Sequence, residues 1–177
     1  MNTHTAEKLL ADLGAGITKT DLITVLAHNP GLFNIYCKLA LSGKQPAAWR
    51  AAWIVDAYDE IYGGCFTSCI PFICLGVETE KNDGVRRAML RILSRYEIPE
   101  PQLARLIDTL YRLLWEGKTV SDKVLSMRIL YRISCHHHEM RHELYDSIGM
   151  QLDMESKGFC SAGKRIMAAI RKEENQN

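Results

Sequence analysis

Three cysteines near the middle of the chain are the first residues whose type and spacing suggest a metal site. Cys65, Cys69 and Cys74 form a C-x3-C-x4-C pattern, and thiolates are the ligands that zinc and iron–sulfur clusters prefer. The residues between them are mostly apolar, and an apolar setting raises the pKa of a thiol. The spacing also matches no standard metal-binding pattern. We therefore expect no cofactor here, and all six cysteines to be buried free thiols that pack as small apolar side chains.

A histidine cluster in the second half of the chain is the next candidate. His136–His138 are adjacent, and on a helix His138 and His142 would share one face at i, i+4, as in a two-histidine metal site. Glu139 or Asp146 could supply a third ligand. However, the adjacent histidines lie where one predicted helix ends and the next begins, and a solvated turn accepts any polar residue. We expect a polar turn with adventitious affinity for nickel or zinc resin, and no physiological metal.

Three carboxylates lie close together on another predicted helix. Asp56, Asp59 and Glu60 stand at i, i+3 and i+4, a spacing that could provide an acid–base pair or bind a divalent cation. Like charges at this spacing mildly destabilise a helix. We interpret the three residues as a solvated acidic face at the end of that helix.

Charge is distributed unevenly along the chain, although the net charge is only +1. Residues 1–80 carry 5 Lys plus Arg and 8 Asp plus Glu, whereas residues 81–177 carry 17 and 13. Arginines of the basic half recur at helical spacing and predict a stripe across stacked helices. The candidate partner-binding residues are Arg87, Arg91, Arg95, Arg105, Arg112, Arg128 and Arg132. Nearby Glu97, Glu100 and Asp108 could instead neutralise the arginines locally, so both interpretations stay open.

Size and composition predict a single domain. A chain of 177 residues, 47% of them hydrophobic, can bury a sizeable core without a metal or a disulfide. Residues 1–14 have the pattern of an amphipathic helix rather than of an apolar leader, and six cysteines are too few for a disulfide scaffold. We therefore expect a protein of the reducing cytoplasm. The longest uncharged run, 61–77, is interrupted by glycine and proline, so no membrane partner is expected.

Apolar residues recur at spacings of three and four throughout the chain, which predicts helices and no strands. The expected helices cover 3–13, 18–28, 30–42, 47–62, 66–78, 83–95, 100–115, 121–135, 137–152 and 161–172. Capping boxes at Thr18 with Asp21 and at Thr119 with Asp122 mark two of the starts. Three glycines are expected to end helices: Gly43, Gly117 and Gly158. Three large aromatic residues are expected in the core: Trp49, Trp53 and Trp115.

The helices repeat along the chain. Anchor positions in successive first helices, at Ala52, Ala88, Met127 and Arg165, are 36, 39 and 38 residues apart, slightly below the ~40–47 of HEAT and armadillo repeats. A helical hairpin buries only one face by itself, so we expect neighbouring hairpins to stack into a right-handed α/α superhelix. The expected divisions are a cap at 1–45, repeats at 46–81, 82–118 and 119–157, and a partial repeat with a C-terminal cap at 158–177. The charged tail 171–177 is expected to fray.

Three segments resemble a family of small bacterial HEAT-like, armadillo-type α-solenoid proteins. They are AWRAAWIVD at 48–56, KVLSMRILYRIS at 123–134 and SKGFCSAGKRI at 156–166. Such proteins often carry an adenylosuccinate lyase label. Lyases of that superfamily resemble one another through a Gly-Ser-Ser-x-Met-Pro-x-Lys loop on a chain more than twice as long. No stretch of this sequence matches that loop, so we expect no lyase activity.

Three functions follow from these observations. We favour a non-enzymatic binding or scaffold module, because stacked hairpins present an extended surface and no constellation of nucleophile, base and oxyanion donors stands out. The alternative is nucleic-acid binding through the arginine stripe, as in the alkylpurine DNA glycosylases that such proteins resemble in outline. An enzyme of unknown class is the third possibility. A deep polar pocket that includes His138 or Asp56 would favour it.

Overall fold

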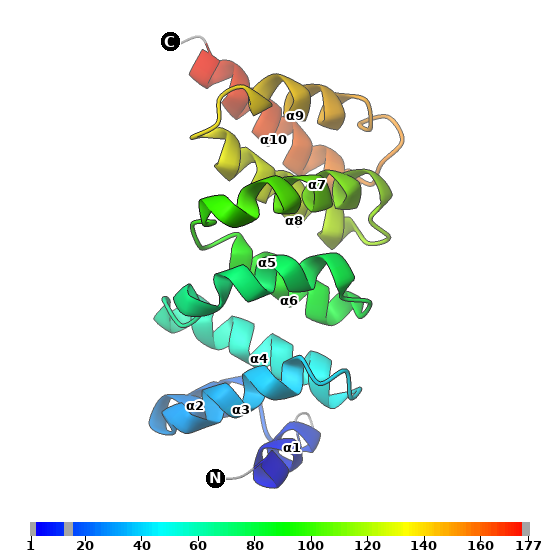
Figure 1. Cartoon of the computed structure of the whole chain (residues 1–177). Coiled ribbons are helices and arrows are strands. Elements are labelled where there is room, and N and C mark those ends of the chain that lie inside the picture. The colour runs from blue at the N-terminus through cyan, green and yellow to red at the C-terminus, as the bar shows by residue number, and fades with distance from the viewer. Residues whose placement is uncertain (1–2, 13–15, 175–177) are drawn as a thin grey trace. The chain divides into compact units, whose positions relative to one another are not determined.

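The structure is a computed structural model that describes residues 3–12 and 16–174 (Figure 1). These ranges contain helices and turns and no β-strand, which confirms the all-α prediction. The helices are α1 (Thr3–Ala11), α2 (Lys19–His28), α3 (Pro30–Ala40), α4 (Ala47–Tyr62), α5 (Ile70–Thr79), α6 (Asp83–Leu93), α7 (Glu100–Glu116), α8 (Val120–Ser134), α9 (Met140–Gly149) and α10 (Lys157–Glu174), and the 3-10 turn η1 (Thr67–Cys69) precedes α5. No helix within the described ranges is long and apolar enough to cross a membrane.

Local signals account for most helix starts. The Thr18 and Thr119 side chains accept hydrogen bonds from the backbone N–H groups of Asp21 and Asp122, and both capping boxes are complete. The predicted stop at Gly158 is wrong, because α10 already begins at Lys157. The anchor positions of the predicted repeat fall in α4, α6, α8 and α10, so every second helix from α4 onward occupies the same position in its repeat.

The chain forms two compact units, each interrupted in sequence. One comprises Met1–Cys69 and Glu80–Ile92, and the other comprises Ile70–Thr79 and Leu93–Asn177. In the first unit, α4 packs against α1, α2 and α3. Its core is built from fully buried side chains such as Leu26, Tyr36 and Ile54.

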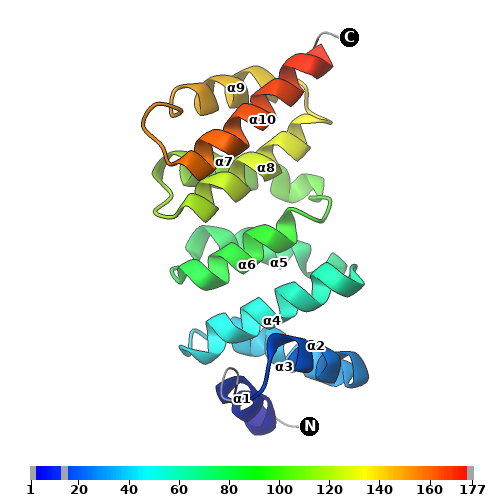
Figure 2. The ribbon, with the colours of Figure 1, turned by 180° about the vertical axis from the view of Figure 1, so that it is seen from behind.

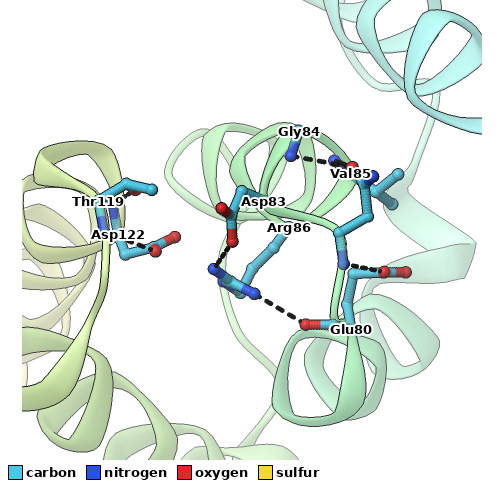
Figure 3. A network of polar contacts seen from close by, with 8 residues as sticks. Glu80, Asp83, Gly84, Val85, Arg86, Thr119 and Asp122 are labelled. Atoms are coloured by element: carbon cyan, nitrogen blue, oxygen red, sulfur yellow. Dashed lines mark hydrogen bonds and ion pairs between the residues drawn. The ribbon is translucent and has the colours of Figure 1, made fainter. Parts of the chain in front are cut away.

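Within the first unit, α6 is tied to α4 by ion pairs. The Arg91 Nε lies 3.0 Å from Asp56 Oδ2, and its Nη2 lies 2.8 Å from Glu60 Oε2. At the start of α6, Arg86 bonds Asp83 at 2.5 Å and the Glu80 carbonyl at 2.9 Å (Figure 3). A guanidinium with several acceptors links elements more firmly than a single neutral hydrogen bond.

Two predictions about this unit are wrong. Asp56 and Asp59 are only 2% and 1% exposed, so they do not form a solvated face. Arg91 pairs with Asp56, and the Cys65 backbone N–H donates to Asp59 at 3.1 Å.

Trp49 and Trp53 are not core residues, because they are 37% and 36% exposed. Trp115 of the second unit is likewise 42% exposed. The apolar buried residues of α4 are small or aliphatic and include neither tryptophan: Ala48, Ala51, Ala52, Ile54, Val55 and Ala57.

In the second unit, α7 packs against both α5 and α8, and α10 packs against α8 and α9. Five leucines of α7 at helical spacing are buried: Leu103, Leu106, Leu110, Leu113 and Leu114. Within this unit, α7 and α9 lie in front of α8 and α10 in Figure 1 and behind them in Figure 2. The described part of the charged tail does not fray, because α10 continues to Glu174, and Glu173 accepts a hydrogen bond from Tyr131 at 2.5 Å and forms an ion pair with Arg141 at 2.8 Å.

Candidate functional site

An open pocket of about 370 Å³ lies in the second unit. The loop between α6 and α7 forms one side together with the first turn of α7, and the end of α8 forms the other with the turn that follows it. Six lining residues are apolar or aromatic and are buried or half-buried, and we call them the floor: Leu93, Tyr96, Ile98, Leu103, Ile129 and Ile133. Five charged or imidazole residues of the lining are exposed or half-buried, and we call them the rim: Glu97, Glu100, Arg132, His136 and His137. Cys135 also lines the pocket. This volume lies at the lower end of the range of ligand pockets, about 300–1,000 Å³.

Prolines shape the first side of the pocket. Pro99 disfavours helical backbone at Ile98, and Pro101 occupies the first turn of α7, where a missing N–H costs nothing. The chain between Leu93 and Glu100 therefore stays non-helical.

The predicted position of Arg95 is wrong. Helix α6 ends two residues before Arg95, so Arg95 does not share a helix with Arg87 and Arg91.

The end of α8 shapes the other side. The backbone N–H groups of His136 and His137 both donate to the Ile133 carbonyl at 3.0 Å. These bonds fold the chain back over the last turn of α8 and place both imidazoles at the rim. Arg132 Nη1 donates to the Ser94 carbonyl, which ties the α6–α7 loop to α8.

Charges of both signs meet at the rim. His137 Nε2 lies 3.9 Å from Glu100 Oε1, and its Nδ1 lies 3.7 Å from Glu139 Oε1, close enough for ion pairs when the imidazole is protonated.

The Cys135 thiol lines the pocket and donates to the Tyr131 carbonyl at 3.3 Å. Burial, together with the nearby Glu173 carboxylate, raises the pKa of Cys135, so this thiol stays protonated at neutral pH and is a poor nucleophile.

The structure brings some predicted site residues together and separates others. Arg132, His136 and His137 converge on the pocket. His138 precedes α9 and bonds the Cys135 carbonyl at 2.9 Å, so it does not share a helix with His142 as predicted. His142 instead lies 3.3 Å from Asp146. In the parts of the chain that the structure describes, no three His, Cys, Asp or Glu side chains are placed to hold a metal ion.

The three cysteines of the C-x3-C-x4-C pattern have different environments. Cys74 is buried in α5, where burial raises its pKa to about 11. Burial also raises the pKa of Cys65, with the nearby Asp59 carboxylate adding to the effect. The expectation that all six thiols are buried is wrong, because Cys69 is exposed and four others are only partly buried: Cys37, Cys65, Cys135 and Cys160.

The predicted arginine residues have different environments. Arg91 contacts Asp56 and Glu60, and Arg105 lies 2.7 Å from Glu78 within the second unit. Three others are exposed on α6, α7 and α8: Arg87, Arg112 and Arg128. In the second unit, Arg105 and Arg112 belong to α7 and Arg128 and Arg132 to α8, which lie in different layers (Figures 1 and 2).

Sequence reasoning missed the apolar floor and the role of Glu97 and Glu100 at the rim. The two prolines at 99 and 101 were the available signal, because they predict a rigid loop directly before a helix.

A family model described as HEAT repeat domain matches residues 7–170. The chain is a HEAT repeat protein. The correspondence of α4, α6, α8 and α10 agrees with this assignment, because the repeat unit is a helical hairpin. No curated protein and no solved structure matches this HEAT repeat protein.

Proposed function

We propose that this HEAT repeat protein is a binding module for a partner polypeptide and that the pocket between α7 and α8 receives side chains of that partner. HEAT repeats commonly act as protein-interaction scaffolds, because stacked hairpins present extended surfaces. The observation that carries the proposal is a pocket that combines a buried or half-buried apolar floor with exposed charged residues at its rim.

The floor provides most of the binding energy in this proposal. Burying one aliphatic or aromatic side chain of a partner gains about 1.5–3 kcal/mol. The floor residues come from the end of α6, the loop after it, α7 and α8, and the buried faces of α7 and α8 set the positions of Leu103, Ile129 and Ile133. A preformed site of this kind spends little conformational entropy on binding.

The rim provides selectivity. Glu97 and Glu100 attract a cationic residue of the partner, and Arg132 and the histidines attract a carboxylate. A segment with one apolar anchor and charged neighbours of both signs therefore fits this pocket better than a uniformly charged polymer.

Nucleic acid is the less favoured partner. Affinity for phosphates depends on arginine and lysine side chains that are available to replace counterions. Arg91 and Arg105 already contact carboxylates, and the arginines of α7 and α8 lie in different layers of their unit.

The test is an enrichment of tagged protein from the lysate of its own cells, at low and at physiological salt. We expect a stoichiometric protein partner with the unmodified chain and its loss with Ile98→Glu, which places a carboxylate on the floor. Glu100→Lys reverses a charge at the exposed rim and should also weaken capture. Ala104→Glu is the matched control, because Ala104 is an exposed residue of α7 outside the pocket.

Circular dichroism of each variant verifies that the helices are intact. Capture of the same partner by the unmodified chain and by both pocket variants would refute the proposed site. Recovery of nucleic acid that is released by salt, without a protein, would favour the alternative function.

A further inference from the structure

Two tryptophans form a partly exposed aromatic surface in the first unit. Trp49 and Trp53 stand four residues apart on α4, with ring centroids 6.5 Å apart and planes inclined by 37°. About a third of each residue is exposed. Tryptophan is the residue type most enriched in the energetic centres of protein interfaces.

A cation lies over each of the two rings. Lys19 Nζ is 5.1 Å from the centroid of the Trp53 ring, and Arg50 Cζ is 5.9 Å from that of Trp49. Both distances fall within the ~6 Å range of cation–π attraction. Among the described residues, neither Lys19 nor Arg50 forms an ion pair with a carboxylate. Within the described part of the chain, this surface therefore carries two cations that are not held in ion pairs.

The fold holds these four side chains in place. Lys19 is the first residue of α2, directly after the capping box at Thr18. Arg50 Nη1 donates to the Leu10 carbonyl at 2.9 Å. A Cβ at Gly84 would lie 3.4 Å from the Trp49 Cβ, so the start of α6 lies against this tryptophan. Rigid aromatic groups lose little entropy when a partner binds them.

We infer that Lys19, Trp49, Arg50 and Trp53 form a docking surface for an acidic peptide segment that carries an apolar side chain. The apolar side chain lies on the indole rings, and flanking carboxylates pair with Lys19 and Arg50. Charge complementarity identifies the occupant, because the surface presents two cations beside apolar rings. This surface is built from residues other than those of the pocket, so the inference does not rest on the proposed function.

A short acidic peptide fits this surface better than a nucleic acid does. Affinity for a nucleic acid depends on many cations that each replace a counterion of the phosphates. This surface offers two cations, Lys19 and Arg50, beside apolar rings, which match the few carboxylates of a short peptide.

The probe is a phage-displayed library of random dodecapeptides, panned against the full chain. We expect enriched sequences that combine Asp or Glu with an aromatic or large aliphatic residue, and binding that weakens as salt rises. Lys19→Glu and Trp53→Ala should each weaken a selected synthetic peptide by about tenfold or more. Lys118→Glu and Trp115→Ala are the matched controls, because Trp115 is an exposed tryptophan with no cation over its ring among the described contacts.

Thermal unfolding of each variant separates lost binding from lost folding, and Lys19→Glu alters only a side chain at the edge of the fold. Several results would overturn the inference: no enrichment, enrichment of basic or uncharged peptides, or binding that both variants leave unchanged. Loss of peptide binding with Ile98→Glu would assign the peptide to the pocket instead. If the chain binds no peptide but binds oligothymidylate, and Lys19→Glu and Trp53→Ala abolish that binding, the surface is assigned to nucleic acid. If it instead self-associates and both variants abolish self-association, the surface is assigned to a second copy of the chain.

Discussion

Replacing Gly163 by alanine tests how closely α9 and α10 pack. Gly163 is buried in α10, and a Cβ added there would lie 2.7 Å from Ile148 Cγ2 and 3.5 Å from Leu152 Cδ2. Ile148 is a fully buried residue of α9. Its branched side chain has few alternative rotamers in a helix, so the two helices must separate to accept the new methyl group.

The expected magnitude is the difference between two effects. Overpacking a close contact costs about 1–3 kcal/mol, and exchanging glycine for alanine inside a helix returns about 1 kcal/mol. Because the displaced methyl group belongs to a constrained side chain, we expect the upper half of the first range. The net loss of unfolding free energy is therefore about 1–2 kcal/mol, which lowers Tm by roughly 2–8 °C for a chain of this size.

Calorimetry and urea unfolding followed by circular dichroism measure this loss. The control is Gly149→Ala in α9, where the new Cβ would lie 3.5 Å from the flexible end of Met167, an ordinary contact. That variant should be as stable as the unmodified chain or more stable by up to about 1 kcal/mol. A Gly163→Ala protein with an unchanged or higher Tm would refute the reasoning about the α9–α10 contact.

Two further predictions concern polar contacts. Asp56→Ala should lower the unfolding free energy by about 2 kcal/mol, because it removes a buried carboxylate that pairs with Arg91. Glu60→Ala removes an exposed carboxylate that pairs with the same arginine and should lower it by less than about 1 kcal/mol. Equal urea midpoints for the two variants would contradict this prediction. The hydrogen bond to Glu173 and burial raise the pKa of Tyr131 to about 12. Since the pKa of Tyr131 in the folded protein lies above its ordinary value, the protonated phenol stabilises the folded state. That contribution to the unfolding free energy is complete below pH 10 and is lost as the pH rises toward 12. The stability difference between the unmodified chain and Tyr131→Phe should therefore narrow from pH 9 to pH 11 in urea titrations, and a constant difference would argue against the contact.

Local sequence patterns account for most of the helical architecture. The leucine spacing in α7 and the capping boxes at Thr18 and Thr119 act within a few residues of one another, so they are readable without a fold. The helix expected at 137–152 begins only at Met140, because the N–H groups after Ile133 bond back to α8. Such backbone turns leave little trace in residue type.

The candidate sites illustrate where sequence reasoning fails. Periodicity predicted that one face of α4 is apolar, but alanines with Ile54 and Val55, rather than the tryptophans, occupy the buried side. Asp56 was expected in solvent, since its partner Arg91 lies 35 positions away in sequence and reaches it only when the folded unit brings α4 and α6 together. The rim of the pocket likewise joins Glu97 to His136 from separate loops.

By itself, the sequence determined that the chain is helical and repeats with a period close to that of a HEAT hairpin. These properties depend on apolar spacing and capping, which are local. The tertiary structure decided which charges are buried, which aromatic rings are exposed and which loops enclose a pocket. Those outcomes depend on contacts between residues far apart in sequence, because burial and pairing arise only when helices pack.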